Sequence, residues 1–202
     1  MLDPYLLTVH TLTLRQLASA EQLADINEQS VPEVEAALEK AAADGAAIAA
    51  RGNYMITPAG RALLDGTYPE AFAEFRSSQA VSDAMDAFET GVNRQLLSLT
   101  TDWQTKMVGG DRVPNDHGDA DYDAAIVDKI GRVYEKTQKV LRPLADLDPL
   151  IDRFLDRIGA ALTRADGGET DYVSGVRVDS VHTVWFQMHE HVLRLTGRER
   201  PE

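Results

Sequence analysis

The chain has 202 residues, no cysteine and a formal net charge of −13. A chain of this length can bury one large core or two small ones. Without cysteine it has no disulfide, no thiolate chemistry and no cysteine-ligated zinc, and its acidic balance argues against a membrane-surface or general nucleic-acid-coating protein. No apolar run reaches the roughly 20 residues of a transmembrane helix. The N-terminus lacks a signal-peptide pattern, so we expect a cytoplasmic protein.

Two capping boxes predict the beginnings of two short helices. Ser19 with Gln22, and Ser30 with Glu33, follow the S-x-x-E/Q pattern, which satisfies two backbone N–H groups at a helix start. After the second box, apolar residues recur at helical spacing as far as Gly45, which favours a helix end.

A small β-wing is expected next. Residues 46–50 and 54–56 are typical of two short strands joined by a turn, and the Thr57-Pro58 pair favours the start of another helix. Residues 2–17 are expected to form a helix that precedes the first capping box; the alternating, β-branched TVHTLTL within it also fits a strand. Its inward side chains are expected to be Leu6, Val9 and Leu17, with His10 as a half-buried structural residue. The order helix, turn, helix, strand, turn, strand predicts a winged helix-turn-helix.

The end of this segment, ITPAGRALL after a short hairpin, resembles the MarR-type regulators. The resemblance covers about the first third of the chain and implies that the second helix of the motif enters the major groove of DNA. That helix, VPEVEAALEK, carries three glutamates against one lysine and has no Arg, Asn or Gln to contact base edges. Residues 1–66 contain nine acidic and four basic side chains, a net charge of −5. DNA affinity depends largely on Lys and Arg at phosphates, so a protein-docking platform is the alternative interpretation. The candidate DNA contacts are Arg51, Asn53 and Lys40.

A domain boundary is expected at residues 66–70, where Thr67 and Glu70 form a further capping box. Residues 67–202 then predict an all-helical domain for ligand sensing, partner binding or dimerisation. The long amphipathic helices are expected at about 79–104, 121–142, 149–166 and 178–196. Four such helices must bury their apolar stripes against one another. The expected fold is therefore mainly α: an N-terminal winged helix with a small β-wing, followed by an antiparallel four-helix bundle-like domain. The polar, glycine-rich link 105–120 is expected to be a loop, and loops of this length often carry function.

An up-down-up-down bundle would bring acidic, aromatic and imidazole side chains to one end. The candidate ligand-binding residues are Asp102, Trp103, Asn115, Asp116, His117, Asp123, Asp179, His182, Trp185 and His189. Three interpretations stay open at this point: helix caps that tie down the loop, a pocket for a small polar or anionic molecule, and a divalent metal site. A metal would need His182 together with His117 or Asp102, because His182 and His189 are separated by about 10.5 Å of helix rise, too far to chelate one ion. No cofactor is expected beyond such a metal.

The segments TDWQ, NDHGDADYDAAI and DSVHTVWFQMHEHVLRLTGRER resemble a module at the C-terminus of actinobacterial phosphoenolpyruvate-utilising proteins of the pyruvate phosphate dikinase-like group. There, too, the module follows a winged-helix segment. The resemblance implies a regulatory or accessory role and assigns no catalytic residue, because the nucleotide-binding and phosphohistidine regions are missing.

No phosphate loop, nucleophile elbow or zincin motif is present, so no catalytic residue is assigned and we expect a non-enzymatic protein. The leading hypothesis is a winged-helix, transcription-regulator-like protein with a helical sensor domain. A homodimer is expected because such regulators pair through appended helices. The first alternative is a module that regulates a phosphoenolpyruvate-utilising enzyme without binding DNA. The second is a metal-dependent enzyme or metal sensor that uses the bundle-end His and Asp residues.

Overall fold

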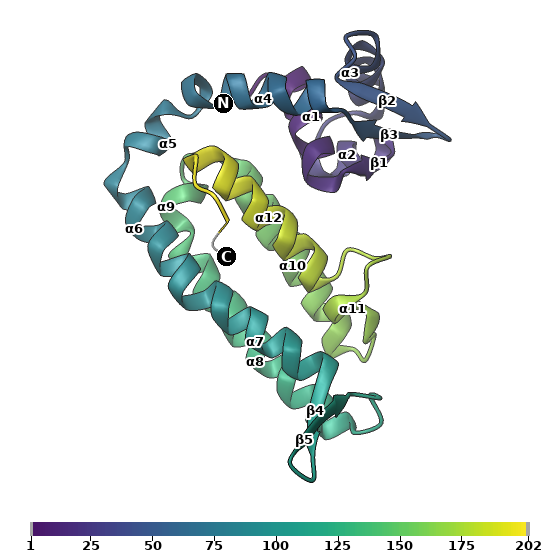
Figure 1. Ribbon diagram of the computed structural model, residues 1–202, viewed down its shortest axis with the longest axis vertical. Coiled ribbons are helices and arrows are strands. Elements are labelled where there is room, and N and C mark those ends of the chain that lie inside the picture. The colour runs from purple at the N-terminus through teal and green to yellow at the C-terminus, as the bar shows by residue number, and fades with distance from the viewer. Residues whose placement is uncertain (1, 201–202) are drawn as a thin grey trace. The chain divides into compact units, whose positions relative to one another are not determined.

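The computed structural model describes residues 2–200 of the chain, which are mainly helical (Figure 1). The chain folds as two compact units. The first unit comprises Met1–Ser78 together with Gln187–Glu202, and the second comprises Gln79–Phe186.

The first unit combines helices with a three-stranded antiparallel sheet of order β1-β3-β2. Its elements are α1 (Pro4–Arg15), β1 (Leu17–Ala18), α2 (Ala20–Asn27), α3 (Val31–Ala43), β2 (Ala47–Ala50), β3 (Asn53–Ile56), α4 (Pro58–Ala71), α5 (Ala73–Ser77) and the last part of α12 (Val181–Thr196). Wholly buried side chains from α1, α2, α3 and α4 form its core. They include Val9, Leu12, Leu23, Val34, Leu38 and Leu64.

Side-chain caps explain where the short helices begin. The Ser19 hydroxyl accepts from the Gln22 N–H at 3.3 Å, and the Gln22 side chain accepts from the Ser19 N–H at 3.0 Å. The Ser30 N–H likewise donates to the Glu33 carboxylate at 3.0 Å. Both capping boxes expected from the sequence are therefore confirmed.

The β2–β3 hairpin has the two-residue turn Arg51-Gly52, since Ala50 is paired with Asn53. Both turn residues have positive φ, 52° and 81°, as a type I′ turn requires. Leu17, which was expected to face inward from the first helix, lies instead in β1 and is exposed. The helix ends at Arg15, and the next residue has a φ of 64°, which turns the chain into the sheet.

The expected boundary at residues 66–70 is wrong, because α4 continues through it to Ala71 with Pro69 inside the helix. The Thr67 hydroxyl does not cap a new helix. It donates to the Leu63 carbonyl at 2.8 Å, a bond typical of a helix interior. The helix persists because Leu64 and Tyr68 are buried on one side of it, which outweighs the hydrogen bond that a proline removes.

The second unit is built on long helices. Its elements are α6 (Gln79–Ala87), the π-helical segment η1 (Phe88–Asn93), α7 (Arg94–Gln104), β4 (Thr105–Val108), β5 (Asp111–Pro114), α8 (Ala120–Val140), α9 (Arg142–Ala145), α10 (Pro149–Asp166), α11 (Asp171–Ser174) and the first part of α12. Helix α8 packs against both α7 and α10 (Figure 1). The helix expected at 79–104 consists of α6, η1 and α7 in succession, and the other three long helices lie within a few residues of the expected ranges. Most of the large apolar side chains on these helices are buried.

The link after α7 was expected to be a loop and is mostly a β-hairpin instead. Thr105 is paired with Pro114 and Val108 with Asp111. The turn residues Gly109 and Gly110 have φ values of 62° and 98°, which glycine adopts without strain. A Gly-Gly pair between short polar strands is a recognised hairpin signal.

The two units also differ from the expected domains 1–66 and 67–202. The first unit continues to Ser78 and takes in the chain from Gln187 onward. The reason is visible in its core, where His10 of α1 contacts Tyr68 of α4 and His191 of α12.

Candidate functional site

Four of the expected site residues meet at the end of α7 and the start of α8. This imidazole–carboxylate cluster consists of Trp103, Asn115, His117 and Asp123. The Asp123 carboxylate lies 2.9 Å from His117 Nδ1 and accepts from Asn115 Nδ2 at 2.8 Å. Asn115 Nδ2 also donates to the Trp103 carbonyl at 3.0 Å, and the ring centroids of Trp103 and His117 are 4.6 Å apart.

Local structure explains the cluster. Asp119 caps α8 by accepting from the Tyr122 N–H at 3.0 Å, which places Asp123 in the first turns of that helix. The Asn115 N–H donates to the Gln104 carbonyl at 2.9 Å, so the hairpin returns to the end of α7. A φ of 56° at His117 then directs the chain toward α8.

Within this cluster the polar groups satisfy one another. Asp123 is buried, and its two carboxylate oxygens contact the Asn115 amide and the His117 ring. The cluster therefore fixes the hairpin between two helices, which is the first of the three interpretations that the sequence left open.

Two neighbouring carboxylates are paired with bases on the hairpin. Asp116 accepts from Lys106 Nζ at 2.5 Å, and this bond lowers the pKa of the Asp116 carboxyl and raises the pKa of the Lys106 amine. Arg112 lies 3.6 Å from the Asp102 carboxylate.

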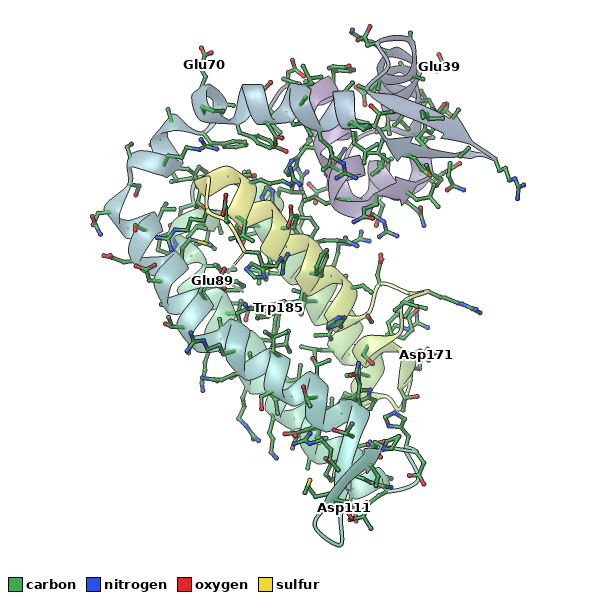
Figure 2. All side chains as sticks on the ribbon, in the orientation of Figure 1. Glu39, Glu70, Glu89, Asp111, Asp171 and Trp185 are labelled. Atoms are coloured by element: carbon green, nitrogen blue, oxygen red, sulfur yellow. The ribbon has the colours of Figure 1, made fainter. Side chains whose placement is uncertain are left out.

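The remaining site candidates have their contacts elsewhere. Asp179 pairs with Arg157 of α10. Trp185 on α12, which is labelled in Figure 2, donates from Nε1 to the Asn93 side chain at 3.0 Å, and its ring stacks on Phe88 of η1. His189 belongs to the first unit, where its Nδ1 lies 3.0 Å from Arg200. The expectation that the candidate residues gather at one end therefore holds only for the cluster at the end of α7 and the start of α8, because Asp179, Trp185 and His189 have their partners on other elements.

No metal-binding group of three His, Asp or Glu side chains occurs among residues 2–200. His117 contacts Asp123, Asp102 lies near Arg112, and His182 is half-buried. Burial lowers the pKa of His182, which favours the neutral ring.

A buried polar network in the first unit was not foreseen from the sequence. His10, expected to be half-buried, is wholly buried; its Nδ1 lies 2.7 Å from the Tyr68 hydroxyl and its Nε2 lies 2.8 Å from His191 Nδ1. Burial lowers the pKa of His191 to about 3 and raises the pKa of Tyr68, so both groups stay neutral at pH 7. Residues 10, 68 and 191 are far apart in the sequence, and no local pattern links them.

The surface of the first unit carries acidic groups on α3. Glu33, Glu35 and Glu39 are exposed, and Glu39 is labelled in Figure 2. Lys40, the single base on that helix, donates to Asp44 at 2.5 Å and lies 4.7 Å from the ring centroid of Tyr5. Arg51 is exposed at the tip of the β2–β3 hairpin.

An exposed apolar row crosses the sheet of the first unit. Met55 of β3 is paired with Leu17 of β1 on one side and with Ile48 of β2 on the other. Directly opposed residues project from the same face of a sheet. The three side chains are 43%, 49% and 56% exposed, respectively. We call Leu17, Met55 and Ile48 the apolar row.

Comparison of the chain with protein-family models, with curated proteins and with solved structures gives no match. The two resemblances stated from the sequence therefore remain predictions. Among the described residues, no helix has the length and apolar character needed to cross a membrane.

Proposed function

We propose that the protein is a non-enzymatic regulatory protein whose first unit is a winged helix-turn-helix that docks on a protein partner. The order α1-β1-α2-α3-β2-β3, with β1 closing the sheet beside β3, supports the winged-helix assignment. In this proposal β2 and β3 form the wing. The long helices of the second unit form a bundle-like accessory domain.

The observation that carries the docking proposal is the apolar row. Three large apolar side chains exposed side by side on one sheet face are typical of a protein interaction site. The neighbouring edge strand β2 contains only alanine and isoleucine, so no charge or proline protects it from pairing with another strand.

The electrostatics favour a partner with basic groups around an apolar contact. Helix α3 packs against β2 and carries three exposed carboxylates with a single, already paired lysine. Such a surface attracts basic groups and repels phosphates. The sequence resemblance makes a phosphoenolpyruvate-utilising enzyme the first partner to test.

The experiment is a capture with the tagged full chain from cells, followed by affinity measurement with the purified partner. Ile48→Lys places a charge in the apolar row and is expected to weaken the complex at least tenfold, about 1.4 kcal/mol. The matched control is Leu97→Lys, which changes a residue of similar exposure on α7 and is expected to leave the affinity within about twofold. The docking proposal would be overturned if Ile48→Lys bound the partner as tightly as the wild-type chain, or if Leu97→Lys weakened the complex as much as Ile48→Lys.

A second candidate function is DNA binding through the wing, and one observation favours it. Arg51 is exposed at the hairpin tip, where a wing contacts the phosphate backbone, and Asn53 follows it at the start of β3. Lys40, the third candidate DNA contact, is paired with Asp44 and would have to break this ion pair before it could contact a phosphate. We rank this function second because one free tip arginine neutralises few phosphates.

A further inference from the structure

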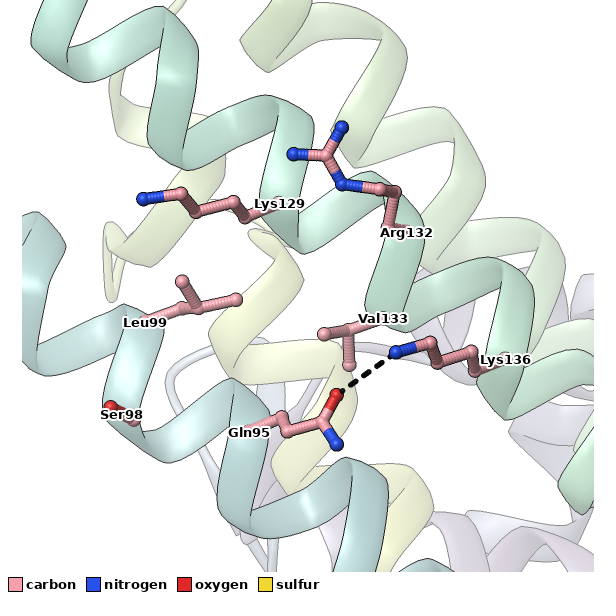
Figure 3. Close-up of a pocket in the computed structure, with 7 residues that line it drawn as sticks. All are labelled: Gln95, Ser98, Leu99, Lys129, Arg132, Val133 and Lys136. Carbon is pink, nitrogen blue, oxygen red and sulfur yellow. Dashed lines mark hydrogen bonds between the residues drawn. The ribbon is translucent and has the colours of Figure 1, made fainter.

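The second unit contains a groove between α7 and α8 with a volume of about 310 Å³. Leu99 and Val133 supply its apolar floor, and Gln95 and Ser98 of α7 line one wall (Figure 3). The other wall carries Lys129, Arg132 and Lys136 of α8. The seven lining residues include no acidic side chain. We call this feature the α7–α8 groove.

The three cations form one stripe because of their spacing. Positions 129, 132 and 136 are i, i+3 and i+7 on a helix, so they share a face. At 1.5 Å per residue the stripe is about 10 Å long, with Arg132 between the two lysines. Like charges at this spacing destabilise an isolated helix slightly, so a bound anion would relieve that repulsion.

The stripe differs from several other basic groups of this acidic chain in having no carboxylate partner in the part of the chain that the structure describes. Several bases elsewhere pair with aspartates: Lys106 with Asp116, Arg142 with Asp146 and Arg157 with Asp179. Among residues 2–200, by contrast, no carboxylate forms an ion pair with Lys129, Arg132 or Lys136. Lys136 points across the groove to Gln95 Oε1 at 3.5 Å (Figure 3).

Two acidic residues of α8, Asp128 and Glu135, adjoin the stripe, and neither lines the groove. Glu135 precedes Lys136 and lines a separate groove between α8 and α10, together with Tyr134 and Asp166. Helix α8 therefore separates charge: its side toward α7 is basic, and its side toward α10 carries a carboxylate. The α7–α8 groove is thus lined by three bases and no acid, although the whole chain carries −13.

We propose that the α7–α8 groove binds a small organic molecule that carries two phosphate groups. The Arg132 guanidinium can donate two parallel hydrogen bonds to the oxygens of one phosphate. The ammonium groups of the two lysines act as point charges that attract the other phosphate oxygens. A stripe about 10 Å long accommodates two phosphates rather than one. Gln95 and Ser98 are placed to bond hydroxyl groups, and Leu99 with Val133 can cover a carbon framework.

The dimensions and the overall charge argue against a large polyanion. A volume near 310 Å³ is at the lower end of the range for small-molecule sites. A nucleic acid or an acidic peptide would extend beyond the stripe, where the negative charge of the chain would repel it. This ligand site lies within the second unit and does not depend on the docking surface proposed for the first.

The test is a titration of the ¹⁵N-labelled full chain at constant ionic strength with fructose 1,6-bisphosphate as the probe. Inorganic phosphate, a short duplex DNA and polyglutamate are titrated in parallel. We expect saturable shifts of the amide signals of residues 95–99 and 129–136, and binding at least tenfold tighter for the bisphosphate than for phosphate.

Two variants of α8 sharpen the test. The double variant Lys129→Gln/Lys136→Gln is expected to weaken bisphosphate binding at least tenfold. The matched control Lys139→Gln removes a cation from the same helix that does not line the groove, and it is expected to change the affinity less than twofold. All these side chains are exposed, so the variants should fold, which their thermal unfolding midpoints will verify.

Four outcomes would overturn the proposal. The first is no binding of the bisphosphate, and the second is equal affinity for inorganic phosphate. The third is an equal effect of Lys139→Gln, which would indicate general surface attraction. The fourth is tighter binding of DNA or polyglutamate, which would assign the stripe to a macromolecule.

Discussion

Acidification should destabilise the first unit through His191. This imidazole is wholly buried beside His10, and the groups around the network are Tyr68 and Arg194, with Asp65 and Glu190 acting at longer range. Burial holds the pKa of His191 near 3, below its ordinary 6.5, so the unfolded chain binds the proton more readily than the folded one. The stability due to the neutral ring is complete above pH 6.5 and is lost as the pH falls from there toward 3.

The loss in the free energy of unfolding follows from the pKa of His191 in the folded chain, about 3, and in the unfolded chain, 6.5. Between pH 7 and pH 5 the unfolded state gains protonation at His191, whereas the folded state stays neutral. Linkage then gives a loss of about 2 kcal/mol in the free energy of unfolding.

Hydrogen exchange of α1 amides, corrected for the intrinsic pH dependence of exchange, measures this free energy in the first unit alone. The variant His191→Gln removes the titrating ring and keeps a side chain that can contact His10. It should lose most of the 2 kcal/mol difference between pH 7 and pH 5, whatever its stability at pH 7. Val9→Ala, a packing control on the same helix, should lower stability at both pH values and keep the full pH response. A His191→Gln protein with the wild-type pH response would refute the reasoning.

Two further predictions concern the second unit and α4. Asp123→Ala should destabilise the second unit by about 1–3 kcal/mol, because buried Asn115 loses one of its two acceptors and His117 loses its carboxylate partner. Urea unfolding followed by tryptophan fluorescence measures this, and an unchanged midpoint would contradict a structural role for the cluster. Gly60→Ala should cost at least about 1–3 kcal/mol, since the new Cβ would lie 2.2 Å from the Ala46 carbonyl oxygen. Gly66→Ala on the same helix meets no atom within 4 Å and should stabilise it by about 0.5–1 kcal/mol, so equal midpoints for the two variants would argue against the packing described.

Local signals in the sequence predicted the local structure well. The serines at positions 19 and 30 begin helices because their caps are formed within four residues, and Arg51-Gly52 turns because of its own backbone preferences. The boundary at residues 66–70 failed because the burial of Tyr68 depends on partners that are distant in sequence.

The candidate site was predicted only where its members are close along the chain. Asn115, His117 and Asp123 lie within nine residues and meet as expected. Trp185 and His189 do not join them, since their neighbours are set by how α12 packs along its length. The helical spacing of the basic stripe on α8 can be read from the sequence. That these bases form no ion pair with any carboxylate the structure describes cannot, because it depends on where the acidic residues of other helices lie.

The central proposal is that the first unit is a winged helix that docks on protein rather than DNA, and its most direct test is a DNA titration at low salt. Non-specific binding by DNA-binding domains is electrostatic and has dissociation constants of about 1–100 µM or tighter under these conditions. Fluorescence anisotropy of a labelled duplex of arbitrary sequence should stay flat up to about 100 µM of the full chain. Saturable binding that weakens steeply with salt and is lost in Arg51→Gln would contradict the account.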